Sequence, residues 1–370
     1  YPFTPEGVEE EVGLMVMEGD ILLGEISTFI PSRSISLINE NERTHSVELS
    51  NIYIEAEDGT VTDSYSVEES EEDRFQNNLM LSYKIDTRNM TKLQKYRLVF
   101  SVGDKTYTTT WMDYVPTPPI DSITYSIPED KQSLEIKVHS TGLDDSLRYF
   151  KYDYQEDWEF NTYFTQRMYY DPETKTVQEY EPGMVTNYYC WNSSTSKEIN
   201  IYTTENISEN IIKDHIVKVI PNTDRRLSYL YAIEVHQKGL SKEAYKYWET
   251  LLKNNDGSSG IFAPQPNELR GNLSCVEDPE EMVLGYVGVS SVQKKRIFIS
   301  STDHLIYRTE HQCQQVTYEE RLWDDMYKMG WDTVFYDEIE KAIYWAPRRC
   351  IDCRVYGNKN KPAFWPNDHQ

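Results

Sequence analysis

The sequence predicts a mostly β protein, in which an N-terminal immunoglobulin- or transthyretin-like β-sandwich precedes a larger β-rich domain with two or three short helices. Three observations support this fold class. Short runs of β-branched and aromatic residues alternate with polar residues, Gly-Asp and Asp-Gly turn signals separate such runs, and only two stretches have helical spacing. Aromatic residues make up 13% of the 370-residue chain, which partly offsets a hydrophobic share of 38%, so the chain can bury a sizeable core.

The first predicted strands lie near the N-terminus. A short apolar run at 14–17 ends in the turn Gly19-Asp20. The segment 47–56 alternates over its second half and is followed by the hairpin signal Asp58-Gly59. Its apolar face is formed by Ile52, Ile54 and Ala56.

A second hairpin is expected around Gly103-Asp104, between 96–102 and 106–111. In its second arm one face carries Tyr107, Thr109 and Trp111. The charged, polar segment 63–74 is expected to be a loop.

A proline cluster marks the predicted domain boundary. Three prolines in four residues, at 116–119, make a stiff and extended connector. We therefore predict a Pro-rich acidic tether over 1–11, a β-sandwich domain over 12–115 and a second β-rich domain over 116–370. The chain opens at Tyr1 with no Met and no apolar signal region, so we expect a mature or trimmed N-terminus.

The second domain has strand signals at both of its ends. Residues 122–127 favour a strand, and 134–139 alternate cleanly with Leu134, Ile136 and Val138 on the apolar face. Further along, 282–289 and 296–299 are typical of buried strands.

Two amphipathic helices are predicted in the same domain. The first begins at Ser241, a favourable N-cap residue, and its apolar stripe consists of Ala244, Trp248, Leu251 and Leu252. The second begins at the capping-box pattern of 317–320 and ends at Gly330, and its buried face is expected to contain Leu322 and Met326.

The segment 149–189 is dense in aromatic residues, which allows two interpretations. One is a tyrosine-faced β-sheet whose hydroxyls reach water at its rim. The other is a stacking platform for sugars or peptides. The candidate residues for ligand or partner contact are Tyr152, Tyr154, Trp158, Tyr163, Tyr169 and Tyr170.

The charge of the chain argues against several classes of partner. A formal net charge of −25 repels phosphate backbones and anionic membrane surfaces, so we expect no nucleic-acid partner. No calcium-loop motif accompanies the acidic residues. No stretch reaches the roughly 18 apolar residues that are needed to span a bilayer.

The five cysteines all lie in the second half of the chain, at Cys190, Cys275, Cys313, Cys350 and Cys353. An odd number leaves at least one unpaired within the chain. Disulfides in an oxidising compartment are the favoured interpretation. A tetrahedral zinc site of three thiolates and His311 is the alternative, although the sequence has only one CxxC element.

Signatures of catalysis are missing from the sequence. It has no G-x-S-x-G elbow, no P-loop and no H-E-x-x-H pair, and its seven histidines are scattered. Carboxylate pairs abound, but with 62 acidic residues none can be singled out for glycoside hydrolysis. We therefore expect a non-enzymatic protein without a cofactor.

Several short segments, taken in their order along nearly the whole chain, carry a resemblance to a known family. They are 16–21, 107–111, 118–123, 189–191, 262–266, 271–273, 283–286, 295–299, 345–354, Gly357 and 361–365. In this order the segments resemble a domain-of-unknown-function family of outer-membrane surface lipoproteins from Bacteroidota, which are typically encoded beside a TonB-dependent transporter.

The resemblance implies a protein that is lipid-anchored at the cell surface through an N-terminal acylated cysteine, which this chain lacks. It also implies an accessory or ligand-capturing role for a TonB-dependent outer-membrane transporter in nutrient uptake. No catalytic residue can be carried over from the family. Two other hypotheses stay open: a free-standing glycan-binding or adhesive module, and a secreted hydrolase that uses a carboxylate pair.

The cysteines near the C-terminus also have a structural interpretation. Bridges from Cys350 and Cys353 to Cys190 and Cys313 would pin the tail onto the second domain, and the sequence leaves their connectivity open. Cys275, beside a polar turn, is expected to be the odd thiol.

Overall fold

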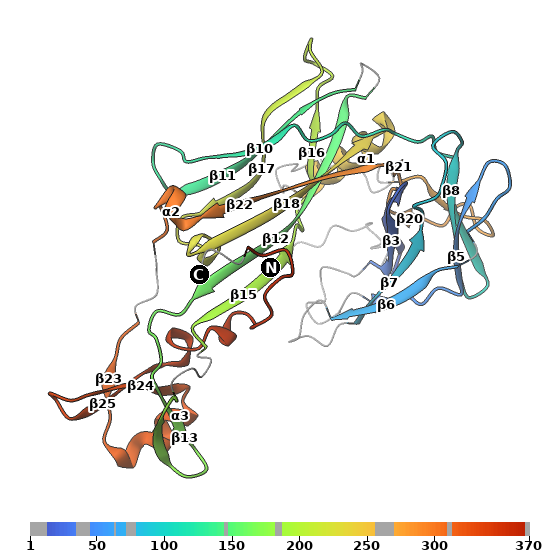
Figure 1. Ribbon diagram of the computed structural model, residues 1–370. Helices are drawn as coiled ribbons and strands as arrows, with labels where there is room; N and C mark the ends of the chain where they lie inside the picture. Colours follow the sequence, from blue (N-terminus) through green and yellow to red (C-terminus); the bar gives the residue numbers. More distant parts are fainter. Residues whose placement is uncertain are drawn as a thin grey trace, which may run out of the picture.

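The computed structural model describes residues 13–34, 45–62, 64–71, 79–143, 147–181, 187–255, 270–308 and 313–366. The predicted tether at 1–11, the segment 262–266 and His311 lie outside these ranges. The fold is mostly β with short helices, as the sequence predicts. A sandwich, a central pair of sheets and a small lobe follow one another in space (Figure 1).

The first sheet of the sandwich has the order β20-β1-β3-β7-β6, and β4 also pairs with β3. Its strands are β1 (Met15–Gly19), β3 (Ile26–Arg33), β4 (His45–Ser46), β6 (Ser66–Glu71), β7 (Leu79–Asp86) and β20 (Val283–Leu284). The second sheet has the order β19-β9-β8-β5. Its strands are β5 (Asn51–Ala56), β8 (Tyr96–Val102), β9 (Lys105–Thr109) and β19 (Leu273–Cys275).

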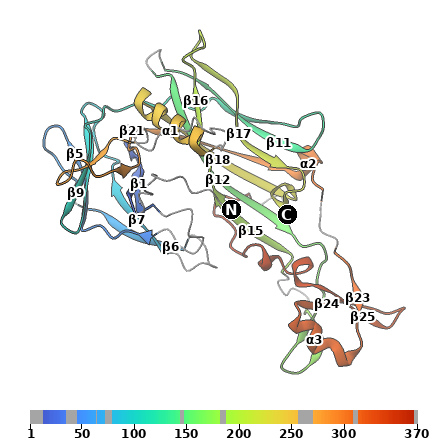
Figure 2. The ribbon, with the colours of Figure 1, turned by 180° about the vertical axis from the view of Figure 1, so that it is seen from behind.

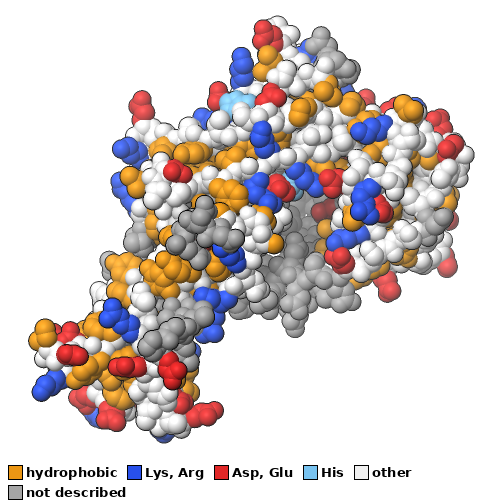
Figure 3. Space-filling model, in the orientation of Figure 1, with side chains coloured by type: hydrophobic (Ala, Val, Ile, Leu, Met, Phe, Trp, Pro, Cys, Tyr) orange, Lys and Arg blue, Asp and Glu red, His pale blue; other side chains and the backbone are white. Residues whose placement is uncertain are grey.

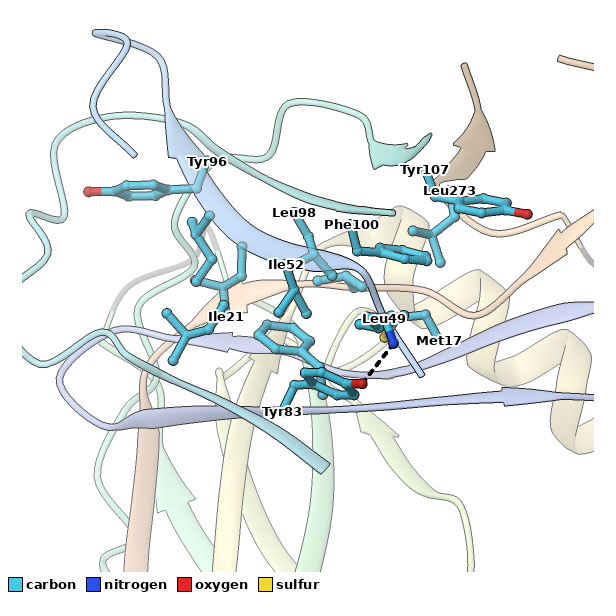
Figure 4. Packing of buried hydrophobic residues seen from close by; sticks show 14 of the residues in the cluster. Met17, Ile21, Leu49, Ile52, Tyr83, Tyr96, Leu98, Phe100, Tyr107 and Leu273 are labelled. Atoms are coloured by element: carbon cyan, nitrogen blue, oxygen red, sulfur yellow. Dashed lines mark hydrogen bonds between the residues drawn. The ribbon is translucent and has the colours of Figure 1, made fainter. Parts of the chain in front are cut away.

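The core of the sandwich lies between these two sheets. Alternating strand residues from both sheets enter it, as period-two patterns require. Figure 4 shows Ile52 beside Tyr83, and Phe100 further along the same cluster, near Tyr107. The Tyr83 hydroxyl accepts a 2.7 Å hydrogen bond from the backbone N–H of Leu49, so this buried polar group is satisfied.

The sandwich is discontinuous in sequence. The chain leaves it near the predicted boundary at 115, but β19, β20 and β21 (Val289–Ser290) return to pair with β9, β1 and β2 (Ile21–Leu22). The return is close-packed at Gly285, where φ is +116° and a Cβ would lie 2.1 Å from the Met17 carbonyl oxygen. Part of the predicted second domain therefore completes the first.

The central part consists of two facing sheets. One has the order β15-β12-β18-β22, with β16 also paired to β12, and the other has the order β10-β11-β17. The strands of the first are β12 (Tyr149–Asn161), β15 (Tyr189–Thr195), β16 (Asn200–Thr203), β18 (Leu230–Leu240) and β22 (Val292–Ser300). Those of the second are β10 (Ser122–Ser126), β11 (Ser133–Thr141) and β17 (Ile211–Pro221). Apolar residues of both sheets share one buried cluster.

The small lobe projects away from the central sheets (Figures 1 and 2). It contains the hairpin β13 (Met168–Asp171) and β14 (Thr176–Glu179), and the sheet β23 (Val316–Thr317), β25 (Ala342–Pro347) and β24 (Trp331–Asp337). Short helical turns flank the sheet: η4 (Glu320–Leu322), α3 (Trp323–Lys328), η5 (Arg348–Cys350) and η6 (Cys353–Val355). The fully buried Trp345 packs against Tyr170, with 5.6 Å between ring centroids.

The first predicted helix is confirmed. Helix α1 (Lys242–Asn255) follows Ser241, whose hydroxyl accepts from the Ala244 N–H at 3.1 Å. A one-turn helix, α2 (Ser301–His304), and the turn η1 (Arg225–Leu227) were not predicted. None of the helices in the described ranges is long and apolar enough to cross a membrane.

Three local predictions are wrong. Thr317 lies in β23, so the second helix begins only at Trp323, and Leu322 is 36% exposed instead of buried. Residues 66–71 of the expected loop form the edge strand β6, because an edge strand tolerates a charged sequence. Trp111 lies beyond the end of β9 and is 40% exposed, because the strand that would have turned its ring into the core ends at Thr109. The guanidinium carbon of Arg97 lies 4.6 Å from the centre of its ring.

Candidate functional site

Two of the tyrosines of β12 face inward. Tyr152 and Tyr154 are 1% and 6% exposed and belong to the buried cluster between the central sheets. The Tyr152 hydroxyl donates to Oε1 of Gln237 at 3.0 Å, and Lys218 Nζ donates to the Tyr154 hydroxyl at 2.7 Å. Neither ring offers a free face to a sugar or a peptide.

The other four candidate aromatic residues lie in three different places. Trp158 is partly buried under Arg226, Tyr163 is 56% exposed, Tyr169 bonds Gln178 across the β13–β14 hairpin, and Tyr170 is buried in the small lobe. The six residues therefore do not form one stacking platform. Alternation along the sequence correctly predicts the strand, but it does not tell which face of the strand is covered.

Four of the five cysteines form two disulfides, Cys190–Cys353 and Cys313–Cys350. Cys275 is buried and free, as predicted. The zinc alternative is therefore wrong, because the three sulfurs that it requires are already covalently bonded. Both bridges fix the C-terminal segment, one to β15 and the other to the segment before β23.

The outer face of the central sheet carries a ladder of alternating charges. Lys238 lies 3.0 Å from Asp153 and 3.5 Å from Asp20, which comes from the sandwich. Asp153 is also 2.7 Å from His236 Nδ1. The ladder continues from His236 to Glu234 at 3.2 Å and from Glu234 to Arg296 at 2.9 Å. It therefore ties the sandwich to the central sheet.

The ladder keeps its central groups ionised. Burial alone would raise the pKa of Asp153, but the hydrogen bond from His236 and the charge of Lys238 hold that pKa well below its usual value. Burial alone would lower the pKa of Lys238, but the charges of Asp20 and Asp153 raise it. Asp153 and Lys238 are therefore both charged at neutral pH, and their ion pair is present there.

A groove of about 550 Å³ lies where the ladder meets the sandwich. Its walls are the end of β1 with Asp20, the start of β12, residues 195–199 and one side of α1. Figure 3 shows charged side chains of both signs gathered at this junction. Helix α1 contributes the apolar wall, with Tyr247, Trp248 and Leu251.

Lys151 is the exception in this environment. Its Nζ lies 3.4 Å from the centre of the Trp248 ring, and within the described ranges it has neither a hydrogen bond nor an ion pair. Burial lowers the pKa of its ammonium group. The groove therefore holds a buried ammonium group that has no direct partner in the described ranges beside an aromatic wall, with the acidic side chains of Glu18, Asp20 and Asp153 also in its lining. The unused N–H donors and the ring suit a ligand that has an anionic group and an apolar part.

Sequence reasoning missed Lys151, Asp153, Lys238 and Asp20. From the sequence, Lys151, Asp153 and Lys238 would be expected on the solvent-facing side of a strand, and Asp20 in a turn. Only the docking of the sandwich onto the central sheet turns this face into a groove. The one available signal is the alternation of Lys and Asp between the aromatic residues of 149–154. In the described ranges no group of three or more His, Cys, Asp or Glu side chains is placed to hold a metal ion.

These features define a class: β proteins in which a discontinuous sandwich docks on a second pair of sheets and leaves a charged, aromatic-walled groove between them. A family model matches residues 1–296, and the chain belongs to that family, Domain of unknown function (DUF4249). The expected membership of a domain-of-unknown-function family is thereby confirmed. No curated protein matches the chain. The matched range contains the groove and ends before the sheet β23-β25-β24.

Proposed function

We propose that this protein is a non-catalytic, lipid-anchored protein of the outer-membrane surface, which captures a ligand for a TonB-dependent transporter in nutrient uptake. Lys151 is the observation that carries the capture part of the proposal. The charges of Asp20, Asp153 and Glu18 offset only part of the cost of burying this cation, because its pKa stays lowered, and a bound anion would offset more of that cost.

The surroundings of Lys151 support this function. Trp248 holds the ammonium group by its ring face, so its N–H donors stay available to a ligand. The neighbouring Lys238 is already occupied by Asp20 and Asp153. Of these two lysines, Lys151 is therefore the one open to an anionic group, and the apolar part of the ligand would rest on Trp248 and Leu251.

The position of the groove supports capture and release. It lies between two separately packed cores, and a junction of this kind permits one part to move relative to the other. The lipid anchor, the outer-membrane location and the transporter partner rest on the order of sequence segments that resembles the lipoprotein family.

The partner is tested by co-purification. The full-length, tagged protein is expressed at its native level and recovered from detergent-solubilised outer membranes, with an unrelated tagged lipoprotein as control. We expect a TonB-dependent transporter to be enriched relative to the control. Recovery of the protein without any transporter would contradict this part of the proposal.

The capture of a ligand is tested by the small molecules that the protein carries from its own cell envelope. Wild type, Lys151→Gln and the control Lys253→Gln are purified under native conditions, and mass spectrometry identifies what denaturation releases. Lys253 is an exposed lysine on α1 that pairs with Glu249 at 3.0 Å. We expect an anionic compound in wild type and control that Lys151→Gln lacks. An identical set of compounds in all three proteins would contradict a ligand at Lys151.

A further inference from the structure

A second cavity, of about 190 Å³, lies at the other end of the central sheet, under the C-terminal segment. Its walls come from the end of β12, from η1 and from the turns η5 and η6. One cysteine of each disulfide, Cys313 and Cys353, lines it. The walls are therefore held together covalently, which favours a preformed site.

The cavity is cationic, although the whole chain has a net charge of −25. Arg225 and Arg349 line it, and none of its described lining residues is acidic. The nearest acidic neighbours in sequence are already paired: Asp224 with Arg226 at 3.4 Å, and Asp352 with Arg354 at 2.7 Å.

Arg225 is held by rings instead of by a carboxylate. Its guanidinium carbon lies 3.6 Å from the centre of the Tyr356 ring and 5.3 Å from that of Phe160. Stacking fixes the plane of a guanidinium and leaves the N–H donors at its edge unused. In the described part of the chain neither Arg225 nor Arg349 has an ion pair or a hydrogen bond through its side chain.

The same cavity contains a third polar group without a partner in the described part of the chain, the hydroxyl of Ser228. The Ser228 hydroxyl oxygen is buried and has no hydrogen-bond partner among the described residues. Buried hydroxyls are nearly always paired, because an unpaired one loses its bonds to water without replacement. Two free guanidinium groups and one unpaired hydroxyl in one cavity match the acceptors of an oxyanion.

We propose that this cavity is a second binding site, which takes the oxyanion group of a small ligand, a phosphate or a carboxylate. Arg225 presents a fork of two N–H donors, Arg349 adds a second charge at the mouth, and Ser228 donates its hydroxyl. The site is independent of Lys151 and of the function proposed for the groove, because no residue lines both cavities.

The test is a calorimetric titration of the full-length, oxidised protein with inorganic phosphate and, separately, with acetate at equal ionic strength. We expect saturable binding of one equivalent of at least one of these anions, and the stronger of the two identifies the oxyanion. Arg349→Gln should weaken that binding about tenfold, because it removes one charge-assisted contact. Arg225→Lys should weaken it by a similar factor, because a lysine keeps the charge but loses the fork.

Arg321→Gln is the matched control. Arg321 is an exposed arginine on η4 that pairs with Glu319, so this change alters the net charge equally but lies outside the cavity. Its affinity should stay within about twofold of wild type. Arg349 is exposed, so Arg349→Gln is expected to fold, and circular dichroism checks this. Absence of saturable binding of both anions, or an equal loss of affinity in Arg321→Gln, would overturn the proposal.

Discussion

The two faces of the central sheet are both covered, but they are covered in different ways. The inner face meets a second sheet and is filled by rings and aliphatic side chains. A buried carboxylate on this face, that of Glu156, is fully compensated: Arg226 and the Tyr231 hydroxyl each lie 2.7 Å from it, and Ser194 lies 2.6 Å from it. On the outer face Lys151 has no such partner in the described ranges.

This difference separates a structural charge from one that is open to a ligand. A charge inside a permanent core is stable only when its hydrogen-bonding capacity is filled, as it is at Glu156. A charged group at a groove whose hydrogen-bonding capacity is unused lowers the stability of the fold. A ligand of opposite charge can offset that loss when it binds. The inner face should therefore respond to substitution with a loss of stability, and the groove with a loss of binding.

The largest loss of stability is expected on the inner face. Tyr152→Ala removes a ring that is 1% exposed and should lower the free energy of unfolding by about 3–5 kcal/mol. Gln155→Ala, on the outer face of the same strand, is the matched control and should cost less than about 1 kcal/mol. Urea denaturation under non-reducing conditions measures both. Equal losses would remove the distinction between the faces.

The second largest effect is expected at the far end of the inner face, where Cys190 is bonded to Cys353 across 163 residues. The double change Cys190→Ser with Cys353→Ser should cost about 2–4 kcal/mol, because a long loop is no longer closed in the unfolded chain. Cys275→Ala, which breaks no bridge, should cost at most about 1 kcal/mol. Peptide mapping without reductant checks the pairing, and Cys275 in a bridge would contradict it.

A smaller, pH-dependent effect is expected at His215, which packs against the inner-face ring of Tyr152. Burial lowers the pKa of His215 from 6.5 to about 4. Between these values the unfolded chain binds the proton more readily, so stability is complete above about pH 6.5 and falls as the pH drops towards about 4.

His215→Gln should remove this part of the pH dependence, which is on the order of 1–3 kcal/mol. The check is the free energy of unfolding of both proteins at several pH values in this window. Parallel curves for wild type and variant would show that His215 does not titrate as described.

Much of the fold is predictable from sequence because alternation and turn signals are local properties. The runs at 96–102, 122–127 and 134–139 all form strands, and Ser241 caps a helix. The return of 273–290 to the sandwich is not predictable, because two-residue strands such as β20 carry no periodicity of their own. The wrong prediction of a helix start at Thr317 has a similar cause. The residues of a capping box are present in the sequence, but Thr317 pairs with β25 and therefore lies in a strand.

The candidate sites were less predictable than the fold. Tyr152 and Lys151 are neighbours in one alternating strand, and the pattern alone makes the ring look like the binding residue and the lysine look like a solvated side chain. The structure places them differently, because a second sheet buries the ring, whereas the sandwich and α1 form walls of the groove that contains the lysine. Arg225 and Arg349 lie 124 residues apart in sequence, so only the disulfide-bonded tail brings them to one cavity.

The smallest expected change in stability is also the most direct test of the central claim, that Lys151 serves a ligand and not the fold. In Lys151→Met the stem and its contact with Trp248 are kept, while the buried charge is removed. The free energy of unfolding of the ligand-free variant, measured by urea denaturation, should equal that of wild type within about 1 kcal/mol or exceed it. A loss of more than about 2 kcal/mol would show that the fold itself depends on the Lys151 charge, and would contradict the claim.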